Sequence, residues 1–318
     1  IFFKIGGKMK VLLFTHSQDI DGMGCAILAR KAFGDYTLVP TKTFDITKNV
    51  EKYIKSKEIY NYDKIFVTDL CIKEPILKFI SNDDILKNKL LVLDHHKTEI
   101  EEGNNKYDFV NIIVEKDGKK VSGTSLFYDY LIEKNFLQRS NILDELVEWT
   151  RQYDVWDWEK NNNTKARYLH ILFEVLGYEK YLDIINYKVD NSDSIVFNNF
   201  EQEVIDKFNK ESKKDIFNIL KDMKCINLHI VDNDFKVGFV KCPYKYRNDM
   251  NKFIKENNIN NIDAVGMIMT DINTVSYRQV KDVDVSLVAK YFGGKGHRGA
   301  GSNLQENEKF KSIIKSIY

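Results

Sequence analysis

Residues 89–97 read KLLVLDHHK. Four consecutive apolar residues, the pattern of a buried strand, are followed directly by Asp94, His95 and His96. An ionisable group at the end of a buried strand lowers stability unless it is paired or binds a metal ion. The stretch therefore predicts a strand of a central sheet whose tip belongs to a site.

The residues before it repeat this pattern. Apolar runs predict strands at 10–16, 36–41 and 62–70, and helical spacing of apolar residues predicts helices at 22–34 and 74–80. Strands that alternate with helices form a parallel, doubly wound α/β sheet, in which ligands bind at the carboxyl ends of the strands. The polar residues expected at that edge are His16, Asp19, Asp21, Asp69, Asp94, His95 and His96.

The next part of the chain has a helical pattern. Ser122 or Thr124 is expected to cap a helix within 122–135. A second helix is expected over 141–151, with Asp154 just past its end, and residues 165–222 are mostly helical in pattern.

From about residue 224 strands return. A hairpin is expected around Asn233-Asp234, followed by strands at 264–272 and 274–280 and by a short helix at 283–294. We therefore predict three parts, namely an α/β domain over 1–195, a helical linker over 196–223 and a smaller α+β domain over 224–318.

Composition restricts the class of protein. The chain has 318 residues and a net charge of +1, which argues against a basic face for long nucleic acid but allows a short anionic substrate. The four cysteines form no CxxC pair, so we expect free thiols in a reducing cytoplasm. No apolar run approaches 18 residues, so no membrane span is expected. Met9 is a candidate natural start, with residues 1–8 lying upstream of it.

The acidic and imidazole groups at the sheet edge predict a metal site. Carboxylates gathered at one place repel one another, and divalent cations remove that repulsion. Mixed His and Asp ligands suit Mn²⁺, and also Mg²⁺, Fe²⁺ or Co²⁺. Two such metals share a carboxylate and can activate water for the hydrolysis of phosphate esters. Taken singly, Asp69 could be a helix N-cap and His16 a structural residue, but their joint order along the strands favours the metal site.

A second candidate site is glycine-rich. Residues 293–302 read GGKGHRGAGS, with five glycines in nine residues, so the backbone could approach a ligand closely. His297 and Arg298 could hydrogen-bond a phosphate beside an anion-binding nest of N–H groups. The alternative is a helix C-cap that runs into a turn. Arg278 lies on the preceding predicted strand, where an exposed strand arginine is the structural alternative.

These motifs resemble those of a known family. HSQDIDG (16–22), VTDL (67–70), LDHHK (93–97) and Asp154 resemble the four motifs of the DHH phosphoesterase superfamily. GGKGHRGAG, preceded by SYR, resembles the glycine-rich motif of the DHHA1 C-terminal domain, although Lys295 gives the looser GGxGH form instead of GGGH. HxxDxDG without a proline before Asp19 most resembles the nanoRNase B type of small oligoribonuclease. The resemblance spans about residues 10–305.

The resemblance implies roles for individual residues. His16, Asp19 and Asp69 match ligands of one metal, and Asp21, Asp69, His95 and Asp154 match ligands of the second. His96 matches the residue that contacts the scissile phosphate and can act as an acid, and Asp94 matches one that orients the histidines, so His96, Asp94 and Asp69 are the expected catalytic residues. The positions that match substrate-binding residues are Arg278, Gly293, Gly294, Gly296, His297 and Arg298.

The resemblance also implies fold and function. The fold would be a Rossmann-like DHH domain and a smaller DHHA1 domain joined by a helical linker, with the active site between them. The activity would be that of a hydrolase with two divalent metal ions, by preference Mn²⁺, with Mg²⁺ or Co²⁺ as alternatives. Its substrate would be very short RNA, cleaved from the 3′ end in the cytoplasm, and a homodimer is possible.

Other functions stay open at this point. A cyclic or linear dinucleotide phosphodiesterase and a 3′-phosphoadenosine phosphate phosphatase share all of these motifs. An inorganic pyrophosphatase of the superfamily is disfavoured because it lacks the GGxGH loop. An inactive nucleic-acid-binding scaffold would normally have lost metal ligands, and none is lost here. Trp156 and Trp158, next to Asp154, could stack a base, although core packing explains at least one of them better.

Overall fold

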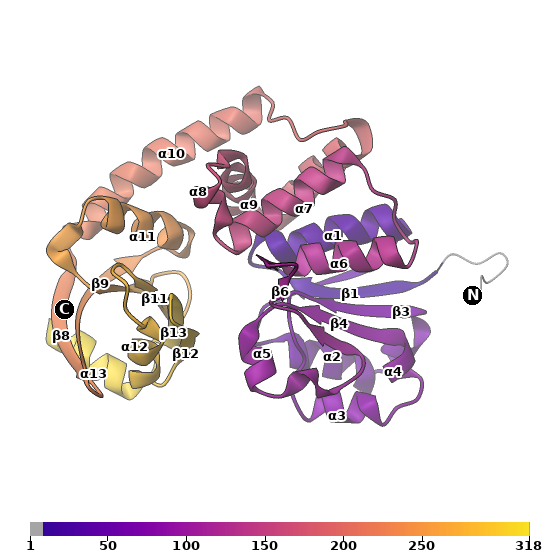
Figure 1. Cartoon of the computed structure of the whole chain (residues 1–318), viewed down its shortest axis with the longest axis horizontal. Helices are drawn as coiled ribbons and strands as arrows, with labels where there is room; N and C mark the ends of the chain where they lie inside the picture. The colour runs from indigo at the N-terminus through magenta and orange to yellow at the C-terminus, as the bar shows by residue number, and fades with distance from the viewer. Residues whose placement is uncertain (1–8, 318) are drawn as a thin grey trace. The chain divides into compact units, whose positions relative to one another are not determined.

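The computed structural model describes residues 9–317, which form two compact units, one ending at Ile205 and the other beginning at Asp206 (Figure 1). The first unit contains a five-stranded sheet in the order β2-β1-β3-β4-β5, in which every pair is parallel. The predicted doubly wound sheet is thus confirmed. Its strands are β1 (Val11–His16), β2 (Thr37–Thr41), β3 (Lys64–Thr68), β4 (Leu90–Asp94) and β5 (Val110–Ile112).

Helices cover both faces of this sheet (Figure 1). One face carries α1 (Ile20–Phe33) and α6 (Gly123–Glu133), and the other carries α2 (Ile46–Lys55), α3 (Ile76–Ser81) and α4 (Leu86–Lys89). Alternate strand residues point to opposite faces, so the apolar runs fill two cores. On the α6 side, Phe66 contacts Phe127 with ring centroids 5.1 Å apart. Short elements complete this half: η1 (Glu58–Asn61), α5 (Lys97–Glu101), η2 (Asn104–Lys106), β6 (Glu115–Lys116) and β7 (Lys119–Lys120).

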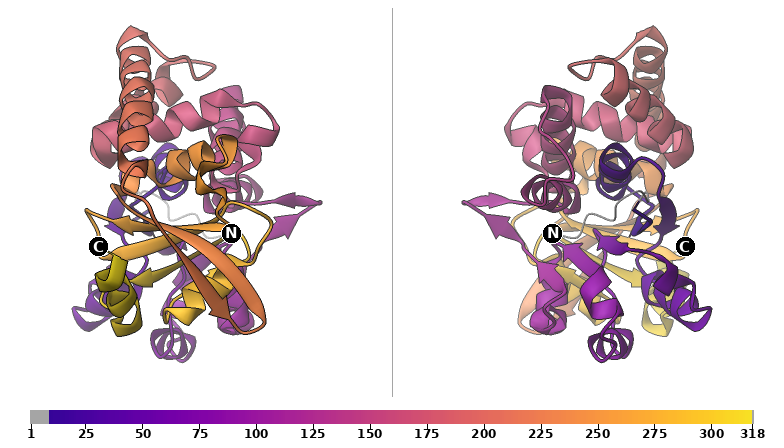
Figure 2. Two further views of the ribbon diagram at one scale, coloured as in Figure 1. Left: turned by 90° about the vertical axis from the view of Figure 1, so that its left-hand side faces the viewer. Right: turned by 90° about the vertical axis from the view of Figure 1, so that its right-hand side faces the viewer.

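Three further helices follow. They are α7 (Asn141–Asp154), α8 (Asp157–Lys160) and α9 (Thr164–Asn191), of which α7 and α9 pack against α1 and α8 packs against α7 and α9. The helix α9 is kinked at Gly177, where φ is +78°. The predicted helix 141–151 is therefore three residues longer, and Asp154 is its last residue and not a loop residue. The β6–β7 hairpin projects outward from the end of this unit's sheet (Figure 2), and its residues are exposed.

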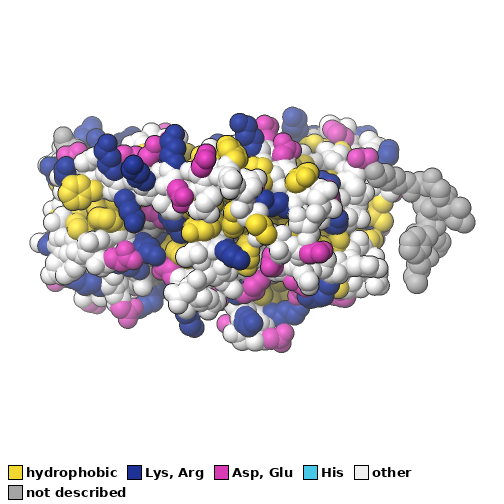
Figure 3. All heavy atoms as spheres, turned by 90° about the horizontal axis from the view of Figure 1, so that it is seen from above, with side chains coloured by type: hydrophobic (Ala, Val, Ile, Leu, Met, Phe, Trp, Pro, Cys, Tyr) yellow, Lys and Arg dark blue, Asp and Glu magenta, His cyan; other side chains and the backbone are white. Residues whose placement is uncertain are grey.

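The helix α10 (Asn199–Leu220) begins in the first unit and ends in the second. It lies within the region where the sequence predicts a helical linker. The predicted domain boundaries at residues 195 and 223 stay predictions. Among residues 9–317, no helix is both long and apolar enough to cross a membrane. On the face drawn in Figure 3, basic and acidic side chains are interspersed, as the balanced charge predicts.

The second unit is built on a mixed sheet in the order β12-β13-β11-β10-β9-β8, in which only β9 and β10 are parallel. Its core includes the rings of Phe239, Tyr277 and Phe292, packed against α12 and α13. The elements are β8 (Lys224–Ile230), β9 (Asn233–Cys242), η3 (Tyr244–Tyr246), α11 (Arg247–Glu256), η4 (Ile259–Asn261), β10 (Ala264–Met269), β11 (Thr274–Gln279), α12 (Val285–Tyr291), β12 (Lys295–His297), β13 (Ala300–Leu304) and α13 (Glu308–Ile317).

The predicted hairpin forms, but its turn lies two residues earlier than expected. Asn233 and Asp234 pair with Ile230 and His229 as part of the ladder, and Val231 takes the left-handed backbone conformation with φ of +55°. The Asn-Asp pair that suggested a turn instead extends the strand, because Asp234 accepts a hydrogen bond from His229 at 2.8 Å.

Candidate metal centre

The strand register gathers the predicted polar residues at one edge of the first sheet. His16 is the last residue of β1, Asp69 follows β3 directly, and Asp94 ends β4. Since Thr15 pairs with Thr68 and Thr68 with Leu93, these three strands end side by side. The backbone N–H of Asp69 donates to the carbonyl of Leu93 at 2.9 Å, which anchors this residue beside the tip of β4.

The first group of candidate ligands consists of His16, Asp19 and Asp69. The Nδ1 atom of His16 lies 2.5 Å from Oδ2 of Asp19 and 3.6 Å from Oδ2 of Asp69. Asp19 also caps α1, because its Oδ1 accepts a hydrogen bond from the N–H of Gly22 at 3.0 Å. The start of α1 thus fixes the position of one carboxylate beside the imidazole.

The second group surrounds Nε2 of His95. This atom lies 3.3 Å from Oδ1 of Asp69, 3.4 Å from Oδ2 of Asp154 and 3.7 Å from Oδ2 of Asp21. Asp69 therefore directs one carboxylate oxygen to each group. That is the geometry expected of a carboxylate shared by two cations.

The electrostatics of this cluster fit bound cations. Burial lowers the pKa of His95, but Asp154, Asp69 and Asp21 outweigh it and raise the pKa well above its usual value. Burial, Asp69 and Asp154 raise the pKa of Asp21. Burial raises the pKa of Asp154 to about 6, although His95 opposes this. The cluster thus favours positive charge, which a bound divalent cation would supply.

Two buried polar atoms without a hydrogen-bond partner also support a metal site. Among the described residues, Oδ2 of Asp69 and Nε2 of His95 are buried and have no hydrogen-bond partner. Buried polar atoms normally have partners, so such atoms require an explanation. Mixed imidazole and carboxylate donors fit Mn²⁺, Mg²⁺ or Co²⁺, and a cation in each group would satisfy one of these atoms, Oδ2 of Asp69 in the first group and Nε2 of His95 in the second.

Asp94 holds the two histidines of the DHH sequence. Its Oδ1 accepts hydrogen bonds from the backbone N–H of His95 at 2.8 Å and from Nδ1 of His96 at 2.7 Å. Burial lowers the pKa of His96, but Asp94 outweighs burial and raises it to about 9. His96 is about half exposed (51%), whereas Asp94 is buried. Although Asp69, Asp94, His95 and His96 could themselves form a ligand group, these hydrogen bonds favour an orienting role for Asp94.

The start of α6 is a component that sequence reasoning missed. The N–H groups of Gly123 and Thr124 donate to the two carboxylate oxygens of Asp21 at 2.6 and 2.9 Å. Of the two predicted caps, Ser122 and Thr124, it is Ser122 that caps the helix, and it forms a capping box with Ser125. A Cβ atom on Gly123 would lie only 2.6 Å from Cβ of Asp69. One glycine thus packs directly against the central carboxylate, and the SGTS sequence was its only signal.

The glycine-rich segment lies in the second unit and is a hairpin instead of a loop. Its strands β12 and β13 pair with each other, and β13 pairs with β11, so that Ala300 lies opposite Arg278. Cβ atoms on Gly294 and Gly296 would lie 2.0 Å from the carbonyl of Ser302 and 2.4 Å from Cα of Gly301. These two glycines therefore allow the strands to approach each other, which is a structural requirement for glycine at both positions.

The other predicted substrate-binding residues are placed as follows. Nη1 of Arg278 donates to Oγ of Ser276 at 2.7 Å. Arg298, which is exposed in the turn between β12 and β13, forms an ion pair with Asp282 at 2.8 Å. Gly293 ends the α12 region with φ of +72°. The side chain of His297 lies outside the described residues. The roles of all six residues in substrate binding stay predictions.

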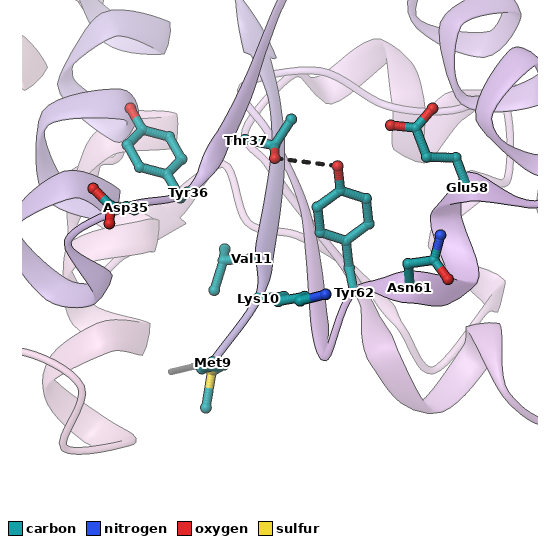
Figure 4. A pocket seen from close by; sticks show the side chains of 9 residues that line it. All are labelled: Met9, Lys10, Val11, Asp35, Tyr36, Thr37, Glu58, Asn61 and Tyr62. Carbon is teal, nitrogen blue, oxygen red and sulfur yellow. Dashed lines mark hydrogen bonds between the residues drawn. The ribbon is translucent and has the colours of Figure 1, made fainter. Parts of the chain in front are cut away.

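A cavity of about 510 Å³ lies away from this cluster (Figure 4). It is lined by the residues where β1 and β2 begin and by η1, and Tyr62 donates to Thr37 across it at 3.1 Å. Parallel strands begin at the edge opposite to the one where they end. None of the predicted site residues lines this cavity.

Comparisons with known proteins agree with the sequence resemblance. Residues 10–150 match the model of the DHH family, N-terminal domain. The chain is 28% identical to oligoribonuclease NrnB of Bacillus subtilis over 309 residues, which cover 96% of this chain and 75% of the relative. The matched family segment contains every candidate metal ligand except Asp154, which lies just beyond residue 150.

Two solved structures share the fold. Exonuclease RecJ bound to manganese matches with a TM-score of 0.55 and 13% identity, over 98% of this chain and 89% of RecJ. The pGpG-specific phosphodiesterase PggH of Vibrio cholerae matches with a TM-score of 0.53 and 11% identity, over 98% and 99% of the two chains. At these identities the likeness concerns the fold alone. Residues 10–150 thus match the N-terminal domain of the DHH family, and the sequence of the chain is similar to that of oligoribonuclease NrnB.

Proposed function

We propose that this protein is a metal-dependent phosphodiesterase that hydrolyses very short RNA, or dinucleotides, from the 3′ end. The observation that carries the proposal is the pair of ligand groups that share Asp69, with the imidazolium of His96 beside them. Similarity to an oligoribonuclease over almost the whole chain supports a short oligonucleotide as the substrate. The balanced charge also favours a substrate with few phosphates.

The ligand residues would act as two sets. His16, Asp19 and Asp69 would hold one divalent cation, and Asp69 would share the second with Asp21, His95 and Asp154. When bound, the two cations supply a nucleophile at neutral pH and offset the charge that develops on the phosphoryl oxygens. Asp69 would hold both cations, because its two oxygens lie beside different groups.

His96 would donate a hydrogen bond to the phosphate. Because Asp94 accepts a hydrogen bond from Nδ1, the ring is held in one orientation and stays protonated at neutral pH. A positioned donor of this kind stabilises charge that develops in the transition state. Asp94 thus acts through His96 and has no direct contact with substrate in this proposal.

Replacing His96 with alanine is expected to lower kcat by about 100- to 1,000-fold, the usual cost of losing one donor to a developing charge. Mn²⁺ affinity, measured by isothermal titration calorimetry, should change by less than about threefold, because His96 belongs to neither of the two proposed ligand sets and is held by Asp94 instead. Calorimetry also separates the two possible roles, since a large loss of Mn²⁺ affinity would make His96 a ligand and refute its role as donor.

A substrate panel tests the proposed function. RNA of two to five nucleotides, pApA, cyclic di-AMP and 3′-phosphoadenosine 5′-phosphate are incubated with the protein and Mn²⁺, and the products are resolved by chromatography. The RNA oligonucleotides and pApA are expected to be cleaved to mononucleotides. Cleavage of only cyclic di-AMP or only 3′-phosphoadenosine 5′-phosphate would reassign the substrate, and no cleavage of any member would refute the proposal.

A further inference from the structure

Trp156 is an exposed aromatic residue that follows the candidate ligand Asp154 closely in the chain. Its side chain is 36% exposed, whereas Tyr153 and Trp158 are buried. Its backbone has φ of +66°, in the left-handed region that a bulky side chain rarely adopts. Such strain persists where the surrounding structure enforces it, and it is concentrated at functional sites. Of the two tryptophans, Trp158 therefore lies in the core and Trp156 is exposed.

The indole of Trp156 is held in place without being covered by a parallel ring. Its Nε1–H donates to Oε2 of Glu159 at 2.9 Å. Trp158 contacts it edge-on, with centroids 5.6 Å apart and planes at 72°, and Tyr153 lies at 5.8 Å and 52°. Among the described residues, no aromatic ring stacks in parallel on Trp156, whereas Tyr153 stacks on His170 at 4.2 Å and 20°. A ring fixed in this way loses little entropy when it binds a flat ligand.

The distance between Trp156 and the second ligand group is comparable to the length of one nucleotide. Two residues of chain span at most about 7 Å, so its backbone lies within that distance of Asp154. Asp154 itself lies 3.4 Å from His95 in the second ligand group. The base of a nucleotide is separated from its phosphate by one sugar. The backbone of Trp156 thus lies within about one nucleotide's length of the second ligand group.

We propose that Trp156 is a stacking platform for the base next to the scissile phosphate. This inference rests on the proposed function and deepens it by naming a base subsite. Stacking is tolerant of sequence because every base has a π-face. The platform would favour nucleotides of any sequence over phosphate esters that have no base.

The test compares the wild-type protein with Trp156→Asn and Trp156→Phe. Asparagine tolerates the left-handed backbone, so Trp156→Asn removes the ring without adding strain. With pApA and Mn²⁺, Trp156→Asn is expected to raise KM by about 5- to 100-fold, the range that stacking on one base gives. The kcat should stay within about twofold, because stacking of this kind is equal in ground and transition states. The KM of Trp156→Phe should lie close to that of the wild type, because phenylalanine keeps a ring on which a base can stack.

A second measurement does not depend on hydrolysis. AMP should quench the tryptophan fluorescence of the wild type and of Trp149→Phe, a matched variant that alters a buried tryptophan stacked on Phe197. AMP should not quench Trp156→Asn, and ribose 5-phosphate, which has no base, should quench none of them.

The outcomes separate this inference from the proposed function. An unchanged KM together with AMP quenching in Trp156→Asn would overturn the platform. A fall in both kcat and melting temperature in Trp156→Asn, with no change in KM, would show that Trp156 only supports Asp154 and would overturn it too. If the wild type hydrolyses no nucleotide but its AMP quenching depends on Trp156, the platform stands and the proposed function fails.

Discussion

Replacing Asp69 with asparagine is expected to lower the rate of Mn²⁺-dependent phosphodiester hydrolysis by at least about 1,000-fold, since a loss of several kcal/mol of transition-state stabilisation has that effect. The reason is geometric, because Asp69 alone directs an oxygen to His16 in one group and to His95 in the other. Asparagine is the suitable replacement, since the φ of +56° at Asp69 is tolerated by asparagine but strained for alanine. Initial rates on pApA measure the effect.

The same variant should not lose stability in the absence of metal. Asp69 raises the pKa of Asp21 and of Asp154 by repulsion and the pKa of His95 by attraction, so removing its charge removes two opposing contributions. We expect the metal-free variant to melt close to the temperature of the metal-free wild type. Mn²⁺ should raise the melting temperature of the wild type and raise that of the variant much less.

Asp83→Asn is the matched control for this experiment. Asp83 lies in the same unit and accepts hydrogen bonds from Tyr60 and Leu86, away from the ligand groups. Its replacement should lower stability slightly and leave the hydrolysis rate unchanged. If Asp69→Asn retains hydrolysis at a rate near that of Asp83→Asn, Asp69 is not the shared ligand.

The first sheet could be predicted because its signal is local. Each strand is a short apolar run, and the polar residue at its end marks the carboxyl edge. Parallel order then places these ends together, so the convergence of His16, Asp69 and Asp94 follows from the fold class. The individual roles of His95 and His96 came from the family resemblance, because no pattern of apolar residues distinguishes two adjacent imidazoles.

The end of α7 could not be predicted because it lacks the usual stop signal. Glycine or proline normally marks the end of a helix, and neither follows Arg151 closely. Here α7 continues to Asp154, and the chain leaves the helical conformation at Trp156, whose φ is positive. The local sequence does not predict a positive φ at this position, since tryptophan rarely adopts such a conformation.

The hairpin form of the glycine-rich segment could not be predicted for a different reason. Gly294 and Gly296 are required by close contacts with Ser302 and Gly301 across a hairpin. A glycine that admits a neighbouring strand and one that admits a phosphate look alike in sequence. Only the pairing of β12 with β13 distinguishes them, and such pairing is not local information.

Replacing Gly123 with alanine is expected to weaken Mn²⁺ binding by about 10- to 100-fold, the usual cost of disturbing residues that position metal ligands. The new Cβ would lie 2.6 Å from Cβ and 2.9 Å from Cα of Asp69, so backbone has to move on one side or the other. If α6 moves, its first N–H groups leave the carboxylate of Asp21, and if Asp69 moves, the shared ligand is displaced. The first shift disturbs the second ligand group, and the second shift disturbs both groups. Isothermal titration with Mn²⁺ measures the affinity without relying on activity.

Gly118→Ala separates this effect from the general cost of adding a methyl group. Gly118 lies in the turn of the β6–β7 hairpin, has φ of +74° and has open space around its missing Cβ. Alanine there strains the backbone but reaches neither ligand group, so stability should fall slightly while Mn²⁺ affinity stays at the wild-type value. Equal Mn²⁺ affinities in Gly123→Ala and the wild type would mean that the cluster absorbs the methyl group, and α6 would then have no part in positioning Asp21 and Asp69. If only Gly123→Ala weakens Mn²⁺ affinity, the start of α6 is an integral component of the metal centre. It contacts both Asp21 and Asp69, although it is not part of the sheet.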